Sequence, residues 1–210
     1  IMKKQILNSI ACLSLVFISF SCSNDTESNE VQILNSKVQK DVDFIIRSAE
    51  TIKKEVEGNR NLLPNFSTQS ELDNYLVLVG ESPGSVSLSF FNQVIGGIGM
   101  AETEGLQYVL NQSNYSAFAK STFLTNSSGE LISDLTQQAD FLNLNISEKE
   151  TVLLTNTLIN DLPSEFHSPE CGVAIIAGIS IGGAICGPPC SIGGAVVGIV
   201  VCFWIKDHQQ

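Results

Sequence analysis

The amino-acid sequence predicts a mainly α-helical protein, in which a small helical domain precedes an apolar, glycine-rich helical hairpin. Three observations support this fold class. Apolar residues recur every three or four positions in the segment 31–57, as on one face of an amphipathic helix. Serine and threonine precede expected helices, where their side chains can cap the first turn. The segment from Gly172 to Ile205 contains no charged residue, and two adjacent prolines divide it.

The first 22 residues have the pattern of a secretory signal. Lys3 and Lys4 precede an apolar run over residues 6–20, and this run ends at Ser21-Cys22. The run is too short for a membrane-spanning helix, which needs about 20 apolar residues. The segment resembles the signal of bacterial lipoproteins, in which signal peptidase II cuts before a cysteine that carries diacylglycerol.

This resemblance implies a signal peptide over residues 1–21, a lipidated Cys22 carrying diacylglycerol and palmitate, and a polar acidic tether over residues 22–30. Serine-rich signals followed by acidic residues are similar to those of Bacteroidota lipoproteins. They imply a lipid anchor at the outer membrane of the cell envelope and leave surface display open. The alternative is an ordinary signal in which Cys22 is an incidental thiol.

A helical domain is expected over residues 31–170. Its first helix should cover residues 31–57 and stop at Glu57-Gly58-Asn59. A cap pattern at residues 67–71 predicts a short helix over 71–79, with a strand over 75–79 as the alternative. Further helical segments are expected at residues 85–100, 105–112, 115–124 and 130–142, with a turn at 126–129. Ser147 as a cap, with Glu150 three residues later, predicts a helix that ends before Pro163.

The tail, residues 171–210, contains a local repeat. Residues 180–187 match residues 191–198 in six of eight positions. Gly187-Pro188-Pro189 lies at the junction of the two copies and would break a helix, so we expect two arms of about 15 residues around a bend. Such arms would be about 22 Å long, short of the hydrocarbon core of a membrane. The tail could be a buried core hairpin, a membrane-inserted element, or a self-association surface through its glycine faces.

Four cysteines lie in or beside this apolar segment: Cys171, Cys186, Cys190 and Cys202. An even number of cysteines in an exported chain predicts disulfides. Cys186 and Cys190 flank the bend, whereas Cys171 and Cys202 lie near the open end. Nested bridges, Cys186–Cys190 and Cys171–Cys202, are therefore preferred among the three pairings.

A catalytic alternative rests on Ser82. Gly80-Glu81-Ser82-Pro83-Gly84 resembles the nucleophile elbow of carboxylesterases, in which a serine lies between a strand and a helix. The Ser–Asp–His order would be completed by Asp134, Asp140 or Asp161 and then by His167. Pro83 argues against this interpretation, because it removes the backbone N–H that normally serves the oxyanion hole.

The composition excludes several classes of function. The net charge of −11 makes the chain a poor partner for nucleic acid. His167 and His208 are the only histidines, and Cys186 and Cys190 have no convincing partner set for zinc. No phosphate loop or dinucleotide fingerprint predicts a cofactor.

The sequence therefore favours a non-enzymatic, lipid-anchored envelope protein that binds or scaffolds an unknown partner. An alternative is a precursor or toxin-like protein with a membrane-active tail, because the tail is similar to glycine- and cysteine-rich bacteriocin-like peptides. A serine hydrolase is the remote alternative.

Overall fold

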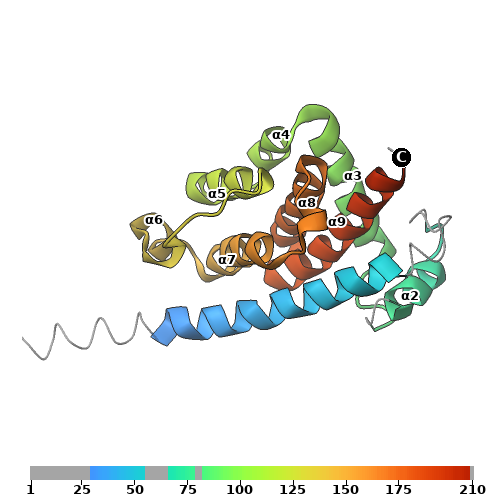
Figure 1. Ribbon diagram of the computed structural model, residues 1–210, viewed down its shortest axis with the longest axis horizontal. Coiled ribbons are helices and arrows are strands. Elements are labelled where there is room, and N and C mark those ends of the chain that lie inside the picture. The colour runs from blue at the N-terminus through green and yellow to red at the C-terminus, as the bar shows by residue number, and fades with distance from the viewer. Residues whose placement is uncertain (1–28, 55–65, 79–81, 209–210) are drawn as a thin grey trace, which may run out of the picture. The chain divides into compact units, whose positions relative to one another are not determined.

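A computed structural model describes residues 29–54, 66–78 and 82–208 of the chain (Figure 1). Every regular element within these ranges is a helix, which confirms the mainly α fold class. The chain divides into two compact units, residues 1–37 and 38–210. In the first unit, only the helical residues 29–37 are described, so the signal segment and Cys22 lie outside the described residues.

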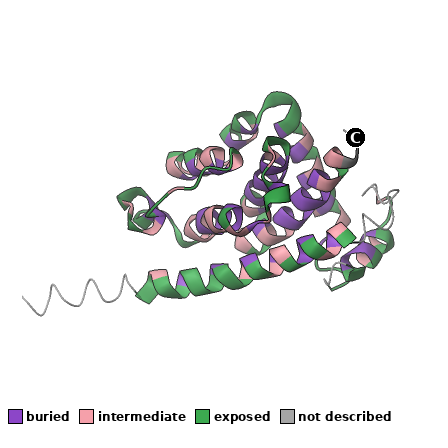
Figure 2. Ribbon diagram, in the orientation of Figure 1, coloured by how far each residue is buried: buried purple, intermediate pink, exposed green. Residues whose placement is uncertain are grey.

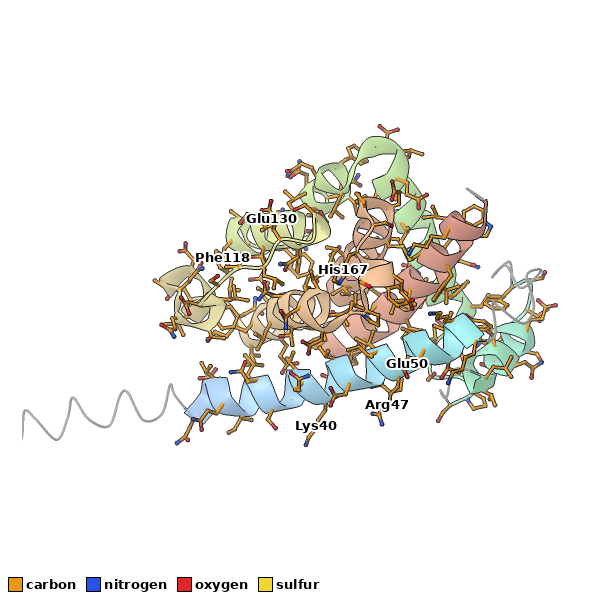
Figure 3. All side chains as sticks on the ribbon, viewed as in Figure 1. Lys40, Arg47, Glu50, Phe118, Glu130 and His167 are labelled. Atoms are coloured by element: carbon orange, nitrogen blue, oxygen red, sulfur yellow. A yellow bond between two sulfur atoms is a disulfide. The ribbon has the colours of Figure 1, made fainter. Side chains whose placement is uncertain are left out.

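The N-terminal helix runs over residues 29–54 and has the amphipathic character expected of residues 31–57. Its buried apolar positions in the second unit lie three or four residues apart and are at most 2% exposed: Val38, Val42, Ile45, Ala49 and Ile52. Lys40, Arg47 and Glu50 are exposed and project outward (Figure 3). The helix starts inside the expected tether, and the expected stop at residues 57–59 lies outside the described residues.

The helix α2 (Gln69–Leu78) is observed in place of the alternative strand. Thr68 Oγ1 accepts the N–H of Glu71 at 3.3 Å. The Glu71 carboxylate in turn accepts the N–H groups of Ser67 at 2.7 Å and Thr68 at 3.2 Å. This reciprocal capping supplies acceptors to N–H groups that have no partner within the helix, and it confirms the cap predicted from the sequence.

Three helices follow along the chain: α3 (Leu88–Glu104), α4 (Leu106–Asn111) and α5 (Ala117–Ser127). Ser87 caps α3 and Ser116 caps α5, because each hydroxyl oxygen accepts an N–H group of the first turn. Gly105 separates α3 from α4 with a φ of 90°, a backbone conformation that glycine adopts without strain. These helices correspond to segments in which the sequence predicts helical structure.

The helix expected over residues 130–142 is not formed, and that prediction is wrong. Two short elements stand in its place, η1 (Leu135–Gln137) and α6 (Ala139–Leu142). The side-chain oxygen of Asn156 accepts the N–H of Ile132 at 2.9 Å. The Asn156 side-chain amide also donates to the carbonyl oxygen of Ile132 at 3.3 Å. In a helix over residues 130–142 that carbonyl would accept the N–H of residue 136, so its contact with Asn156 favours the irregular path. Asp134 then takes a left-handed φ of 52°.

The helix α7 (Ile146–Asp161) begins at a different cap from the one predicted. Asn145, rather than Ser147, precedes the first turn, and its side-chain oxygen accepts the N–H of Glu148 at 3.0 Å. Asparagine caps a helix at least as well as serine, so the earlier residue takes this role. The end of the helix before Pro163 is as expected.

After the short η2 (Ser164–Phe166), α8 (Pro169–Cys186) and α9 (Pro188–His208) form a hairpin. The hairpin lies in the middle of the second unit and carries much of its buried surface (Figure 2). The helices α3, α4, α5 and α7 contact α8, and α3 and α7 also contact α9. The tail therefore packs with the preceding helices in one compact unit, as in the buried-core alternative.

Candidate functional site

The bend of the hairpin is determined by three residues. Gly187 ends α8 with a φ of 80°, a conformation that residues with a side chain rarely adopt. Its N–H donates to the carbonyl of Gly183 at 2.9 Å and closes the last turn. Pro188 and Pro189 then occupy the first two positions of α9, where a helix has no internal partner for an N–H group. The prolines that would break a continuous helix thus begin the second arm.

Two disulfides bracket the hairpin, with the nested connectivity preferred from the sequence. Cys171 and Cys202 join its open end, with a Cα–Cα distance of 4.6 Å, and both are fully buried. Cys186 and Cys190 join its tip, with a Cα–Cα distance of 5.6 Å. The buried bridge closes a sequence separation of 31 residues, which corresponds to about 3–4 kcal/mol in the chain-entropy model.

The two arms pack backbone against backbone at glycines. A Cβ atom added to Gly178 would collide with the carbonyl oxygen of Gly194, and one added to Gly194 would collide with that of Gly178. Gly182 faces the backbone of Cys190 in the same way, and Gly198 faces the backbone of α8. The glycines spaced four apart on each arm therefore allow the close approach that their spacing predicts.

A largely buried polar cluster connects the hairpin to α7 and to Tyr115, which precedes α5. The Tyr115 hydroxyl donates to the carbonyl oxygen of Ser180 at 3.0 Å. The hydroxyl groups of Thr151 and Ser191 lie 3.2 Å apart within hydrogen-bonding distance. Gly183 lies between these groups, and a Cβ atom there would meet both Tyr115 and Ser191. The absence of a side chain at Gly183 therefore makes room for the polar contact.

Burial raises the pKa of Tyr115 above its ordinary value of 10.0. A hydrogen bond with Thr151 opposes this shift, and the negative charge of Glu148 adds to it. Sequence reasoning missed Tyr115, because its partner Ser180 is 65 residues away and no local pattern links them. Ser180 and Ser191 differ from their neighbours only in being polar residues of an apolar segment, and this does not identify their partners.

A shallow groove of about 380 Å³ lies beside the open end of the hairpin. Its lining combines two acidic and four other side chains: Glu102, Glu170, Ala101, Pro169, Val173 and Ile205. Partial burial raises the pKa of Glu102. The carboxylates would favour a cationic ligand, but acidic residues in an open groove do not by themselves define one.

The hydrolase candidates His167 and Asp161 have hydrogen-bond partners outside the expected triad. Ser82 lies in an exposed turn that follows α2, whereas the elbow arrangement requires a strand at that point. His167 is exposed, and its Nε2 atom lies 2.9 Å from the carbonyl oxygen of Leu162 (Figure 3). The Asp161 carboxylate accepts a hydrogen bond from Gln39 at 3.1 Å. The hydrogen-bond partners of His167 and Asp161 are thus groups other than Ser82.

Asp134 and Asp140 are both exposed, on the irregular segment and on α6. Within the described ranges, no three histidine, cysteine, aspartate or glutamate side chains are grouped so that they could hold a metal ion. The side chain of His208 is not among those described.

No protein family model, curated protein or solved structure matches this chain. The hairpin, its disulfides and the lipoprotein-like signal are therefore the features on which a functional proposal rests.

Replacing Gly178 with alanine should lower the free energy of unfolding by about 1–3 kcal/mol, because the methyl group has no room between two backbones. Gly96→Ala in α3 is the matched control, since no neighbouring atom lies within 4 Å of the added Cβ. That change should stabilise the protein by about 0.5–1 kcal/mol. Urea unfolding measures both variants, and equal effects would contradict the close contact in the hairpin.

Tyr115→Phe should lower the free energy of unfolding by about 0.5–1.5 kcal/mol at neutral pH, because it removes the hydrogen bond to Ser180. The raised pKa of folded Tyr115 also predicts a pH dependence. Its contribution to stability is complete below the unfolded pKa of about 10 and is lost as the pH rises above it. Unfolding measured from pH 8 to 11 should show this loss in the wild type and a smaller one in Tyr115→Phe; parallel curves would contradict the assignment.

Proposed function

We propose that the chain is a lipid-anchored protein of the bacterial cell envelope whose helical unit binds or scaffolds a partner. The observation that carries this proposal is the buried disulfide between Cys171 and Cys202. Disulfides of this kind form and persist in oxidising compartments outside the cytoplasm. The bridge therefore supports the export that the signal segment before Cys22 predicts.

A lipidated Cys22 would hold the protein on the membrane without a spanning helix, because several acyl chains together give stable anchoring. The apolar hairpin would then not be needed as an anchor and could form the hydrophobic core of the helical unit. Its fully buried residues on both arms, such as Ile175, Ile179 and Ile199, support this role. An outer-membrane location, with or without surface display, is part of the same proposal.

The anchor can be tested by growing cells with an alkyne-labelled palmitate analogue and detecting label on the purified protein. The wild-type chain should be labelled, and Cys22→Ala should lose the label and leave the membrane fraction. Cys12→Ala is the matched control, because that cysteine lies within the expected signal peptide and should not affect labelling. Undiminished labelling of Cys22→Ala would reject lipidation at this residue.

A second candidate, a membrane-active hairpin, is favoured by the observed helix lengths. The apolar spans contain 18 residues in α8 and 19 in α9, longer than the arms of about 15 residues expected from the sequence. At 1.5 Å per residue they are about 27–29 Å long, close to the hydrocarbon thickness of a bilayer. More than half of each span is buried within the unit, so insertion would require the hairpin to leave its neighbours.

Trp204 is the only tryptophan of the chain and lies near the end of α9, so its fluorescence reports on the hairpin. If the hairpin inserts, the chain from residue 22 with Cys22→Ala should show quenching of Trp204 by brominated lipids and should release dye from vesicles. Ile185→Lys at the exposed tip should block both effects, because a charge would have to cross the bilayer. Ile185→Val is the control that should retain them. Unquenched emission without dye release would reject this second candidate.

A further inference from the structure

The two disulfides of the hairpin differ in their surroundings. Cys171 and Cys202 are each 0% exposed. At the tip, by contrast, Cys186 is exposed and Cys190 is half-buried. A thiolate can attack a disulfide only where it can reach a sulfur atom. The buried bridge is therefore protected from exchange, whereas the tip bridge is open to attack at Cys186.

The leaving group at the tip is also favourable. Cys190 is the third residue of α9, a helix of 21 residues, and it therefore lies in the first turn. The N–H groups of a first turn and the helix dipole place partial positive charge there, which favours the thiolate form of a cysteine. A thiolate stabilised in this way leaves a disulfide readily. Attack at Cys186 with departure of Cys190 is thus the preferred direction of exchange.

The surface around the tip suits a peptide partner. Ala184, Ile185 and Pro189 are exposed apolar residues next to the bridge, and Ile185 is 43% exposed. They offer apolar contacts to residues that flank a cysteine in an extended or incompletely folded chain. The hairpin itself carries no charged residue between Gly172 and Ile205.

The rest of the hairpin would remain closed during such a reaction. The bridge between Cys171 and Cys202 holds the open end, and the contact between Gly178 and Gly194 holds the two arms together. Reduction at the tip then removes a loop closure of only four residues in sequence. The fold can therefore accommodate the oxidised and the reduced tip.

We propose that Cys186–Cys190 is a thiol–disulfide exchange site that oxidises a dithiol on an exported polypeptide. One partner thiolate attacks Cys186 Sγ, forms a mixed disulfide and releases Cys190 as the thiolate. The second partner thiol, after losing its proton, attacks the partner sulfur of the mixed disulfide and releases Cys186. The partner gains a disulfide, and the tip gains the two electrons and two protons as a pair of thiols. This activity is independent of lipid on Cys22.

The experiment uses the chain from residue 22 with Cys22→Ala, so that the four hairpin cysteines are the only cysteines of the protein. The protein is mixed with reduced glutathione, quenched with acid, alkylated and analysed by peptide mass spectrometry. The glutathione adduct should form on Cys186. Reduced glutathione should attack this disulfide about tenfold or more faster than it attacks the disulfide of oxidised glutathione. Cys171 and Cys202 should stay oxidised. An adduct mainly on Cys190 would overturn the proposal. So would attack on the tip disulfide no faster than attack on the disulfide of oxidised glutathione.

Two variants at exposed Pro189 test the role of the helix terminus with matched shapes. Pro189→Asp places a negative charge beside Cys190 and should slow the release of its thiolate about two- to fivefold relative to Pro189→Asn. Circular dichroism checks that both variants are folded. Equal rates in two folded variants would show that the tip is an exposed structural bridge and would overturn the exchange site.

A reduced model peptide with two cysteines is the final probe. The wild-type protein should convert it to its disulfide with stoichiometric appearance of thiols at Cys186 and Cys190. Cys186→Ser should abolish this conversion, because no tip disulfide is then present. If Cys186→Ser still oxidises the peptide, another part of the protein is responsible, and the exchange site at the tip is rejected.

Discussion

The close contact between α8 and α9 is the constraint on which the rest of the structure depends. Gly178 and Gly194 let the two backbones touch, and no side chain can be added at either position without moving an arm. Apolar helices that approach so closely bury their facing surfaces completely, which leaves their outer faces for α3, α5 and α7. The hairpin can therefore act as the centre around which the amphipathic helices pack, and Tyr115 and Thr151 add polar contacts to Ser180 and Ser191 of its arms.

Local signals account for the parts of the fold that the sequence predicts. The reciprocal cap of Thr68 and Glu71 marks the start of α2, and the Gly187-Pro188-Pro189 bend divides the tail. A long-range contact accounts for the failed helix over residues 130–142. Asn156 binds both backbone groups of Ile132 from 24 residues away, and no pattern within residues 130–142 predicts that partner. The contact of Tyr115 with Ser180 was missed for the same reason.

In the candidate site, too, local sequence signals predict some features, and others depend on long-range packing. The cysteine positions around the bend were sufficient to prefer the nested pairing, but the sequence did not distinguish a buried hairpin from an inserted one. That choice depends on whether other helices cover the arms, which is a property of the whole unit. The packing also gives the two disulfides different surroundings, because Cys171 and Cys202 lie in the interior while Cys186 is exposed to solvent. An anchor at Cys22 and a reactive tip would be compatible, since they use different parts of the chain.

Hydrogen exchange of the oxidised chain, followed by mass spectrometry, tests most directly whether the hairpin is the centre of the folded unit. If it is, amides in the buried middle of α8 and α9, around Ile176 and Val197, should exchange more slowly than those of α2 and α4. Such protection reports the free energy of opening each segment. Exchange in the hairpin as fast as in α2, with both disulfides intact, would contradict a central position of the hairpin.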